Sequence, residues 1–269
     1  MLRRWCIPLA GLGLVLGMLA VAGPAAAAPA AHPNAAHLIR PAAHLVRPTG
    51  HGTRPLVAHG GPANAASSTN WSGYAATTGP YTSVSASWTE PTGTCSGSAK
   101  YSSFWVGLDG YNSSTVEQTG SEVDCSGSTP EYYSWYEMYP AYPVNFSNTV
   151  RPGDHFTGSV TYTGSGHYTL KLSDTTRGWS HTVTKTLNGA ANSSAEAIVE
   201  APCCTSSGGP LPLAHFSSVP FSGDTANGHT FGSLGATKIT MVNNSGQAKD
   251  SISSTNGGTS FTATWLRSN

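Results

Sequence analysis

The segment Val84-Ser-Ala-Ser-Trp88 decides the fold, because apolar and small polar residues alternate along it. Successive side chains of a β-strand point to opposite faces, so this alternation predicts a half-buried strand. The same period recurs along the chain between turns rich in Gly, Pro, Asn and Ser. The apolar positions of the later runs are Phe156, Gly158 and Val160, then Tyr168, Leu170 and Leu172, then Ile239 and Met241, and finally Phe261, Ala263 and Trp265. No segment has a sustained helical period, so we expect one all-β domain, an antiparallel two-sheet sandwich or a barrel.

The first residues have the features of an export signal. Arg3 and Arg4 precede an apolar stretch from Ile7 to Ala22, and a run of small residues follows it. This pattern predicts a secretory signal peptide over residues 1–28. Its apolar core is short for a membrane span, and no later segment is apolar for long enough. We therefore expect a secreted, extracellular protein that has no membrane contact after signal cleavage.

Residues 29–65 are rich in Ala, Pro and His and contain a seven-residue repeat, Ala35–Pro41 followed by Ala42–Pro48. Proline at the end of each unit prevents a long helix. We interpret this segment as a disordered leader, either a propeptide or a linker, that precedes the β domain at 66–269. One hypothesis is that its histidines mask an acidic surface until they become charged in acid; a passive linker is the alternative.

The charge of the chain is unevenly distributed. The formal net charge is zero, but residues 1–65 hold five arginines and no acid, so the remainder has 13 − 5 = 8 basic and 13 acidic residues, a net charge of −5. An acidic body argues against a nucleic-acid partner. Charged residues make up 10% of the chain, against about 25% in typical proteins. Because acid unfolds proteins largely by protonating paired carboxylates, few ion pairs predict tolerance of low pH.

Four cysteines remain after Cys6 is removed with the signal, and four cysteines allow three disulfide connectivities. We expect a Cys95–Cys125 bridge in an oxidising compartment. The adjacent Cys203 and Cys204 could form a strained vicinal disulfide or remain as free thiols. No CxxC or CxxH spacing is present, so we expect no metal site.

Polar residues interrupt four strand-like segments, which are Trp105–Gly110, Val116–Gly120, Ser134–Pro140 and Ala195–Glu200. Buried polar groups are costly unless they are satisfied or used. Period-two alternation puts Trp135 with Glu137 on one face of their strand and Glu196 with Glu200 on one face of theirs. One sheet face could then display Trp135, Glu137, Glu200 and the nearby Gln118. Alternation would also put Trp105 and Asp109 together if their strand is regular. We predict a polar cleft, walled by aromatic rings, for an extended polymer.

Several catalytic signatures are missing from the sequence. It contains neither a G-x-S-x-G elbow nor an H-E-x-x-H zinc motif, and no Asp-Thr-Gly or Asp-Ser-Gly pair of an ordinary aspartic protease. The catalytic chemistry that the sequence still allows is that of carboxylate and amide side chains. The polar segments, in their order along the chain, resemble those of the glutamic peptidases, the eqolisin family of acid endopeptidases. Trp105-Val-Gly-Leu-Asp109-Gly is similar to the family's W-V-G-I-D-G, and Gln118-Thr-Gly120 to its Q-T-G.

Three further motifs extend this resemblance over Asn70 to Phe221. They are Asn70-Trp-Ser-Gly for the family's N-W-A/S-G, Trp135-Tyr-Glu137-Met-Tyr-Pro for W-Y-E-W-Y-P, and Ala195-Glu-Ala-Ile-Val-Glu200 for A-E-W-I-V-E. The chain departs from the family in two places. Ala197 stands where the family has Trp, and Ser-Glu-Val-Asp-Cys125 follows Gly120 where the family has Val-Asp directly.

The resemblance implies a concanavalin-like jelly roll and a catalytic dyad of Gln118 and Glu200. Glu200 would be the general base that activates a water, and Gln118 would hold that water and stabilise the oxyanion. The assisting or substrate-binding residues would be Trp105, Asp109, Trp135 and Glu137. The substrate would be a polypeptide, no cofactor is needed, and nothing in the sequence demands more than a monomer.

Two other functions fit parts of the pattern. A glycoside hydrolase could use Glu137 and Glu200 as acid and nucleophile, with aromatic rings stacking on sugars. A non-catalytic carbohydrate-binding sandwich would use the aromatic residues alone. Neither alternative gives Gln118 a role.

Overall fold

The computed structural model describes residues 65–111, 113–202 and 209–269. In these ranges the chain forms strands joined by turns and loops, and no helix long and apolar enough to cross a membrane is present. The predicted signal peptide at 1–28, all but the last residue of the predicted leader at 29–65, and the Cys203–Cys204 pair lie outside the described residues.

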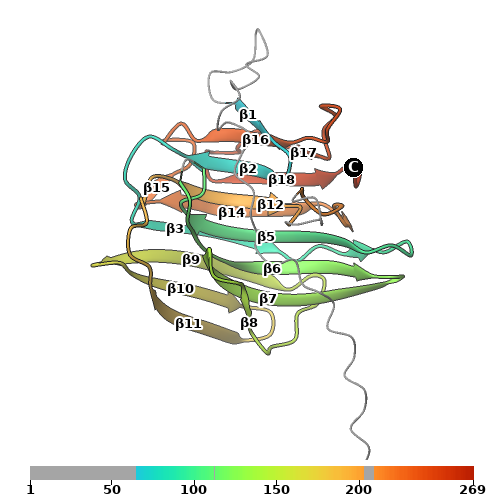
Figure 1. Ribbon diagram of the computed structural model, residues 1–269, viewed down its shortest axis with the longest axis horizontal. Helices are drawn as coiled ribbons and strands as arrows, with labels where there is room; N and C mark the ends of the chain where they lie inside the picture. The colour runs from blue at the N-terminus through green and yellow to red at the C-terminus, as the bar shows by residue number, and fades with distance from the viewer. Residues whose placement is uncertain (1–64, 112, 203–208) are drawn as a thin grey trace, which may run out of the picture. The chain divides into compact units, whose positions relative to one another are not determined.

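The first of two large sheets has eight strands and carries all four polar segments (Figure 1). Its neighbours pair antiparallel except the edge pair β1 and β16, which is parallel. In order across the sheet, the strands are β1 (Ala65–Ser68), β16 (Thr237–Met241), β2 (Trp71–Ala76), β12 (Ala195–Glu200), β5 (Lys100–Leu108), β6 (Val116–Ser126), β7 (Thr129–Tyr139) and β8 (Val144–Asn145).

The second large sheet is antiparallel throughout, and β15 (His229–Thr230) pairs with one of its strands, β14. A small third sheet joins β4 (Gly93–Thr94) to β13 (His215–Phe216). The strands of the second sheet, in order, are β11 (Trp179–Thr186), β10 (His167–Asp174), β9 (His155–Gly164), β3 (Ser83–Thr89), β14 (Val219–Ala226), β18 (Ser260–Trp265) and β17 (Asp250–Ile252).

The apolar core lies between the two large sheets, which confirms the predicted sandwich. Along β3 every second residue is buried, and Trp88 stacks on Phe156 with ring centroids 5.7 Å apart. Burial of one large apolar side chain contributes about 1.5–3 kcal/mol. The Trp88 indole N–H also donates to the Ser121 hydroxyl at 2.8 Å, which satisfies the polar atom of the ring inside the core.

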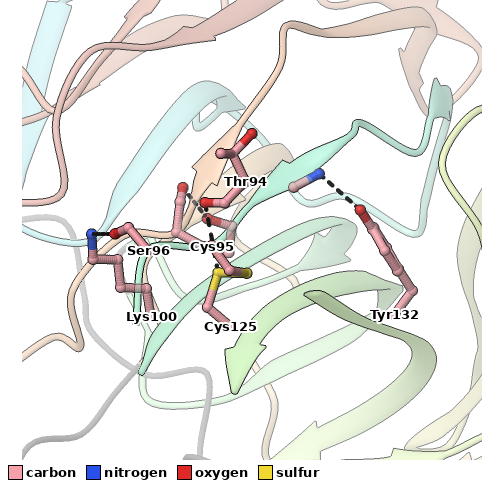
Figure 2. The surroundings of a disulfide bond; sticks show 9 residues. Thr94, Cys95, Ser96, Lys100, Cys125 and Tyr132 are labelled. Carbon is pink, nitrogen blue, oxygen red and sulfur yellow. Dashed lines mark hydrogen bonds between the residues drawn. A yellow bond between two sulfur atoms is a disulfide. The ribbon is translucent and has the colours of Figure 1, made fainter. Parts of the chain in front are cut away.

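The predicted disulfide between Cys95 and Cys125 is confirmed, and it ties the segment after β4 to the end of β6 (Figure 2). Two hydrogen bonds lie beside it. The backbone N–H of Gly93 donates to the Tyr132 hydroxyl at 2.8 Å, and the Lys100 ammonium donates to the Ser96 hydroxyl at 3.3 Å. Together these contacts hold the ends of β5, β6 and β7, the strands from which the site is built.

Candidate active site

The predicted site residues lie mainly on the outer face of the first sheet, away from the core. Residues directly opposite one another in antiparallel strands point to the same side. Gln118 on β6 is opposite Gly107 on β5, and Gly107 is opposite Glu196 on β12. Glu200 shares the face of Glu196 because four residues separate the two along one strand. Gln118 and Glu200 therefore project from the same face.

Aromatic side chains form the wall of this face. Trp71, Trp105 and Trp135 belong to one buried cluster that is separate from the core between the sheets. The rings of Trp71 and Trp105 meet edge to face, with centroids 4.9 Å apart. Edge-to-face contact is a favourable arrangement for aromatic rings, so the cluster fixes the positions of the polar groups among which it lies.

Two neutral donors hold the carboxyl group of Glu200. The side-chain amide of Asn70 donates to Oε1 at 3.1 Å, and the indole Nε1 of Trp105 donates to Oε2 at 2.9 Å. The hydroxyl of Ser68 in turn donates to Asn70 Oδ1 at 2.9 Å. The sequence assigned no site role to Asn70, although it begins one of the five motifs; its proximity to Glu200 depends on β2 pairing with β12.

Gln118 is oriented by its neighbour on β7. Glu137 lies directly opposite it, and the Gln118 side-chain amide donates to Glu137 Oε2 at 2.5 Å. The carbonyl oxygen of Gln118 is buried and has no hydrogen-bond partner among the described residues. An unsatisfied buried acceptor is costly, and a water molecule that donates to it would remove that cost.

Gln118 and Glu200 are related diagonally across the sheet. Gln118 is level with Glu196, two strands away, and Glu200 lies four residues farther along β12. Trp105 on β5 lies between them in register, opposite Ile198, and its indole reaches Glu200. The two residues are therefore offset by two strands and four residues rather than placed directly opposite each other.

Asp109 does not share the face of Trp105. Strand β5 ends at Leu108, and Asp109 has a φ of +69°, so the regular strand on which that prediction depended stops one residue too early. The Asp109 carboxylate instead accepts the backbone N–H groups of Asn192 and Ser193 at 2.7 and 2.8 Å. It anchors the segment that leads into β12, and so acts at a distance from the carboxyl group of Glu200.

Two further buried acids lie near Asp109. Burial raises the pKa of Glu117 to about 9, and repulsion from the Asp109 carboxylate adds to the effect. Burial also raises the pKa of Glu196 well above its usual range, with further repulsion from Asp109 and Glu117. Burial therefore favours the neutral form of both carboxyl groups in an acidic medium. No cluster of three or more His, Cys, Asp or Glu side chains suited to a metal occurs in the described part of the chain.

Comparison with known proteins decides the family. A family model described as the peptidase A4 family matches residues 69–265, which is most of the chain. The chain belongs to the peptidase A4 family. It is a glutamic peptidase, a protease, as the five motifs predicted.

Individual relatives of this glutamic peptidase agree. The chain is 31% identical to aspergillopepsin-2 of Aspergillus niger over 203 residues, which cover 66% of this chain and 71% of the relative. It also resembles scytalido-glutamic peptidase solved with a transition state analog inhibitor, with 27% identity, a TM-score of 0.64, and coverage of 74% of this chain and 98% of the other. The eqolisin SCP-B, solved in complex with the tripeptide Ala-Ile-His, matches with 25% identity, a TM-score of 0.60 and the same coverage.

Proposed function

We propose that this glutamic peptidase is a secreted, acid-active endopeptidase in which Glu200 and Gln118 act on one water molecule. The observation that carries the proposal is that both side chains project from one aromatic-walled sheet face, where no described residue donates a hydrogen bond to Gln118 Oε1. A water donating to that oxygen would be the nucleophile. Relatives solved with a transition state analog inhibitor and with a tripeptide support a peptide substrate.

Glu200 is the general base in this mechanism. Its carboxylate takes a proton from the water as the oxygen attacks the scissile carbonyl, and then returns it to the leaving nitrogen. Asn70 and Trp105 each donate to one carboxyl oxygen and so fix the orientation of the base. No covalent intermediate forms, since the attacking oxygen comes from water.

Gln118 positions the water and stabilises the developing oxyanion. One of its two amide hydrogens is given to Glu137, which leaves the carbonyl for the water and the second N–H for the oxyanion. Such a donor contributes about 2.7–4 kcal/mol to catalysis. An amide does not titrate, so this part of the site works equally well in acid, where a histidine would be protonated.

The remaining predicted residues have supporting roles in this scheme. Glu137 orients Gln118, Trp105 orients Glu200, and Trp135 forms part of the wall against which an extended peptide would lie. Asp109 is a positioning residue, since it holds the backbone at Asn192 and Ser193 just before β12. Residues 1–28 would be the signal peptide, 29–65 the propeptide and 66–269 the peptidase domain.

The decisive assay incubates the secreted, processed protein at acidic pH with a denatured protein and, separately, with polysaccharides, in the presence of pepstatin. We expect proteolysis that pepstatin does not block, and loss of it in Glu200→Gln and Gln118→Ala. Release of sugars would instead assign Glu137 and Glu200 to a glycoside hydrolase. Binding without turnover would indicate a carbohydrate-binding module.

The proposed leader has its own test. Deletion of residues 29–65 should change secretion, or the pH at which activity begins, if the leader masks the peptidase domain. Unchanged secretion and an unchanged onset of activity would identify it as a passive linker.

A further inference from the structure

A second polar pocket, of about 370 Å³, lies outside the proposed dyad. It is formed where the turn after β16 approaches the residue that follows β1. Its lining includes Thr69, Val242, Asn243, Asn244, Ser245 and Lys249. Backbone N–H groups of Ser245 and Gln247 donate to Asn243 Oδ1 at 3.0 and 2.9 Å, so the turn that forms the wall is held by its own hydrogen bonds.

Lys249 is the unusual member of this pocket. The residue is only 2% exposed, yet its ammonium has no hydrogen bond or ion pair with any residue of the described ranges. Its backbone is fixed, because its N–H donates to the Met241 carbonyl and its carbonyl accepts from the Leu266 N–H. The side chain is otherwise buried and its ammonium is open to the pocket, so an anionic group there would meet a cation that no described residue pairs with.

The neighbouring acid does not fill that role. Asp250 is buried next to Lys249 in the chain, but its carboxyl group accepts a hydrogen bond from the Ser72 hydroxyl on β2. Burial lowers the pKa of Lys249 to about 8, while attraction to Asp250 opposes this shift. Lys249 is therefore charged throughout the acidic range.

We infer that this pocket binds a carboxylate group, held against the Lys249 ammonium and the polar groups of Asn244 and Thr69. A monoanion fits because Lys249 has the one charged side chain among the described lining residues, which also include Gly209, Pro210 and Asn269. The carboxylate could come from a free small acid or from a bound peptide. Thr69 directly precedes Asn70, whose amide contacts Glu200, so an acidic group on a peptide near the dyad could reach it. The bound peptide as a source rests on the proposed function. The binding of a carboxylate in the pocket does not.

The first arm of the test uses acetate and the purified, full processed protein. At about pH 6, ordinary carboxylates are ionised and Lys249 remains charged. Titration followed by amide chemical shifts should give saturable changes at Thr69 and Asn243–Ser245, and acetamide should give none. Lys249→Met should weaken binding about tenfold or more, as expected for loss of a charge-assisted hydrogen bond. Lys171→Met, on the exposed face of β10, is the matched control.

The thermal midpoint separates binding from a structural role. Lys249→Met removes a buried charge, so the thermal midpoint should not fall. If Lys249 were instead needed to balance the charge of Asp250, the same substitution would lower the midpoint. Absence of saturable acetate binding by the wild type, equal binding by Lys249→Met, or tighter binding of inorganic phosphate than of acetate would overturn the inference.

The second arm identifies the source of the carboxylate. A peptide series in which Glu replaces Gln at one position at a time should reveal a position at which Glu raises kcat/KM, and Lys249→Met should abolish that preference while hydrolysis of the Gln peptides is unchanged. Acetate binding without such a preference assigns the pocket to free acids. Acetate binding in a protein that cleaves no peptide would refute the proposed function and leave the pocket intact.

Discussion

The indole of Trp105 donates a hydrogen bond to Oε2 of Glu200 at 2.9 Å, across the antiparallel pair of β5 and β12. This contact joins a motif from the first half of the domain to one that follows 95 residues later. In the proposed mechanism it fixes the general base, and it gives each of the two motifs a reason to be present.

Trp105→Phe tests that contact. Phenylalanine keeps an aromatic ring beside Trp71 but cannot donate to Glu200. Hydrogen bonds to charged groups contribute about 1.5–3 kcal/mol, so kcat/KM should fall about 10- to 100-fold with an unchanged circular dichroism spectrum. Trp179→Phe, on β11 of the second sheet, is the control and should retain activity. Equal activity of the two variants would contradict the role given to Trp105.

Asn70→Asp tests the other donor to Glu200. The substitution replaces a donor at 3.1 Å with a second carboxyl group, and like-charge repulsion disfavours ionisation of the base. A base must be unprotonated to act, so the acid limb of the profile of kcat/KM against pH should move to higher pH by about one unit. Asn256→Asp, at an exposed position before β18, should leave the limb in place. A profile that does not move would show that Asn70 has no electrostatic link to the base.

The faces of the site strands were predictable from the sequence, but long-range contacts were not. Alternation correctly put Val84, Ala86 and Trp88 on the buried face of β3. It could not reveal that Asn70 meets Glu200, because that contact spans 130 residues and needs the strand order β2–β12–β5. It also missed the turn at Asp109, where a positive φ ends the strand pattern.

Glu117 shows a different limit of the sequence. It directly precedes Gln118 and belongs to no predicted site set, yet the residue is completely buried. Alternation places it on the opposite face from Gln118, and in a sandwich that face is covered by the second sheet. The low charge of the chain predicted acid tolerance, and buried acids such as Glu117 provide a second physical cause.

Buried carboxyl groups should make the fold more stable in acid than near neutrality. Burial raises the pKa of Glu117 to about 9 and those of Glu90 and Asp224 to about 8. Between the usual value, 4.5 for Glu and 3.8 for Asp, and the raised one, the folded state keeps a proton that the unfolded state has released. Stability is therefore greatest below about pH 4.5 and falls as pH rises toward 9, by up to about 1.4 kcal/mol per pH unit for each group.

Glu117→Gln should weaken this dependence. The amide cannot ionise, so the fall in thermal midpoint from about pH 4 to about pH 7 should be smaller than in the wild type. Differential scanning calorimetry across this range measures the effect. Glu131→Gln, at an exposed position of β7, should reproduce the wild-type slope; a Glu117→Gln slope as steep as the wild type's would remove Glu117 from the account.

The disulfide should contribute mainly to stability. Cys95 and Cys125 close a loop with a sequence separation of 30, for which chain entropy gives about 3–4 kcal/mol. The double variant Cys95→Ser/Cys125→Ser should unfold at lower denaturant concentration and, below its transition, keep peptidase activity. A double variant serves better than a reductant, which would also act on Cys203 and Cys204. Complete loss of activity in the folded variant would place the bridge within the catalytic machinery.

In the proposed mechanism Gln118 and Glu200 act on one water molecule, although two strands and four residues separate them in register. A high-resolution crystal structure of the processed enzyme at acidic pH tests it most directly. We expect a single water within hydrogen-bond distance, about 3 Å, of both the Gln118 side-chain amide and the Glu200 carboxylate. Two side chains too far apart to contact the same water, with or without a bound peptide analogue, would contradict it.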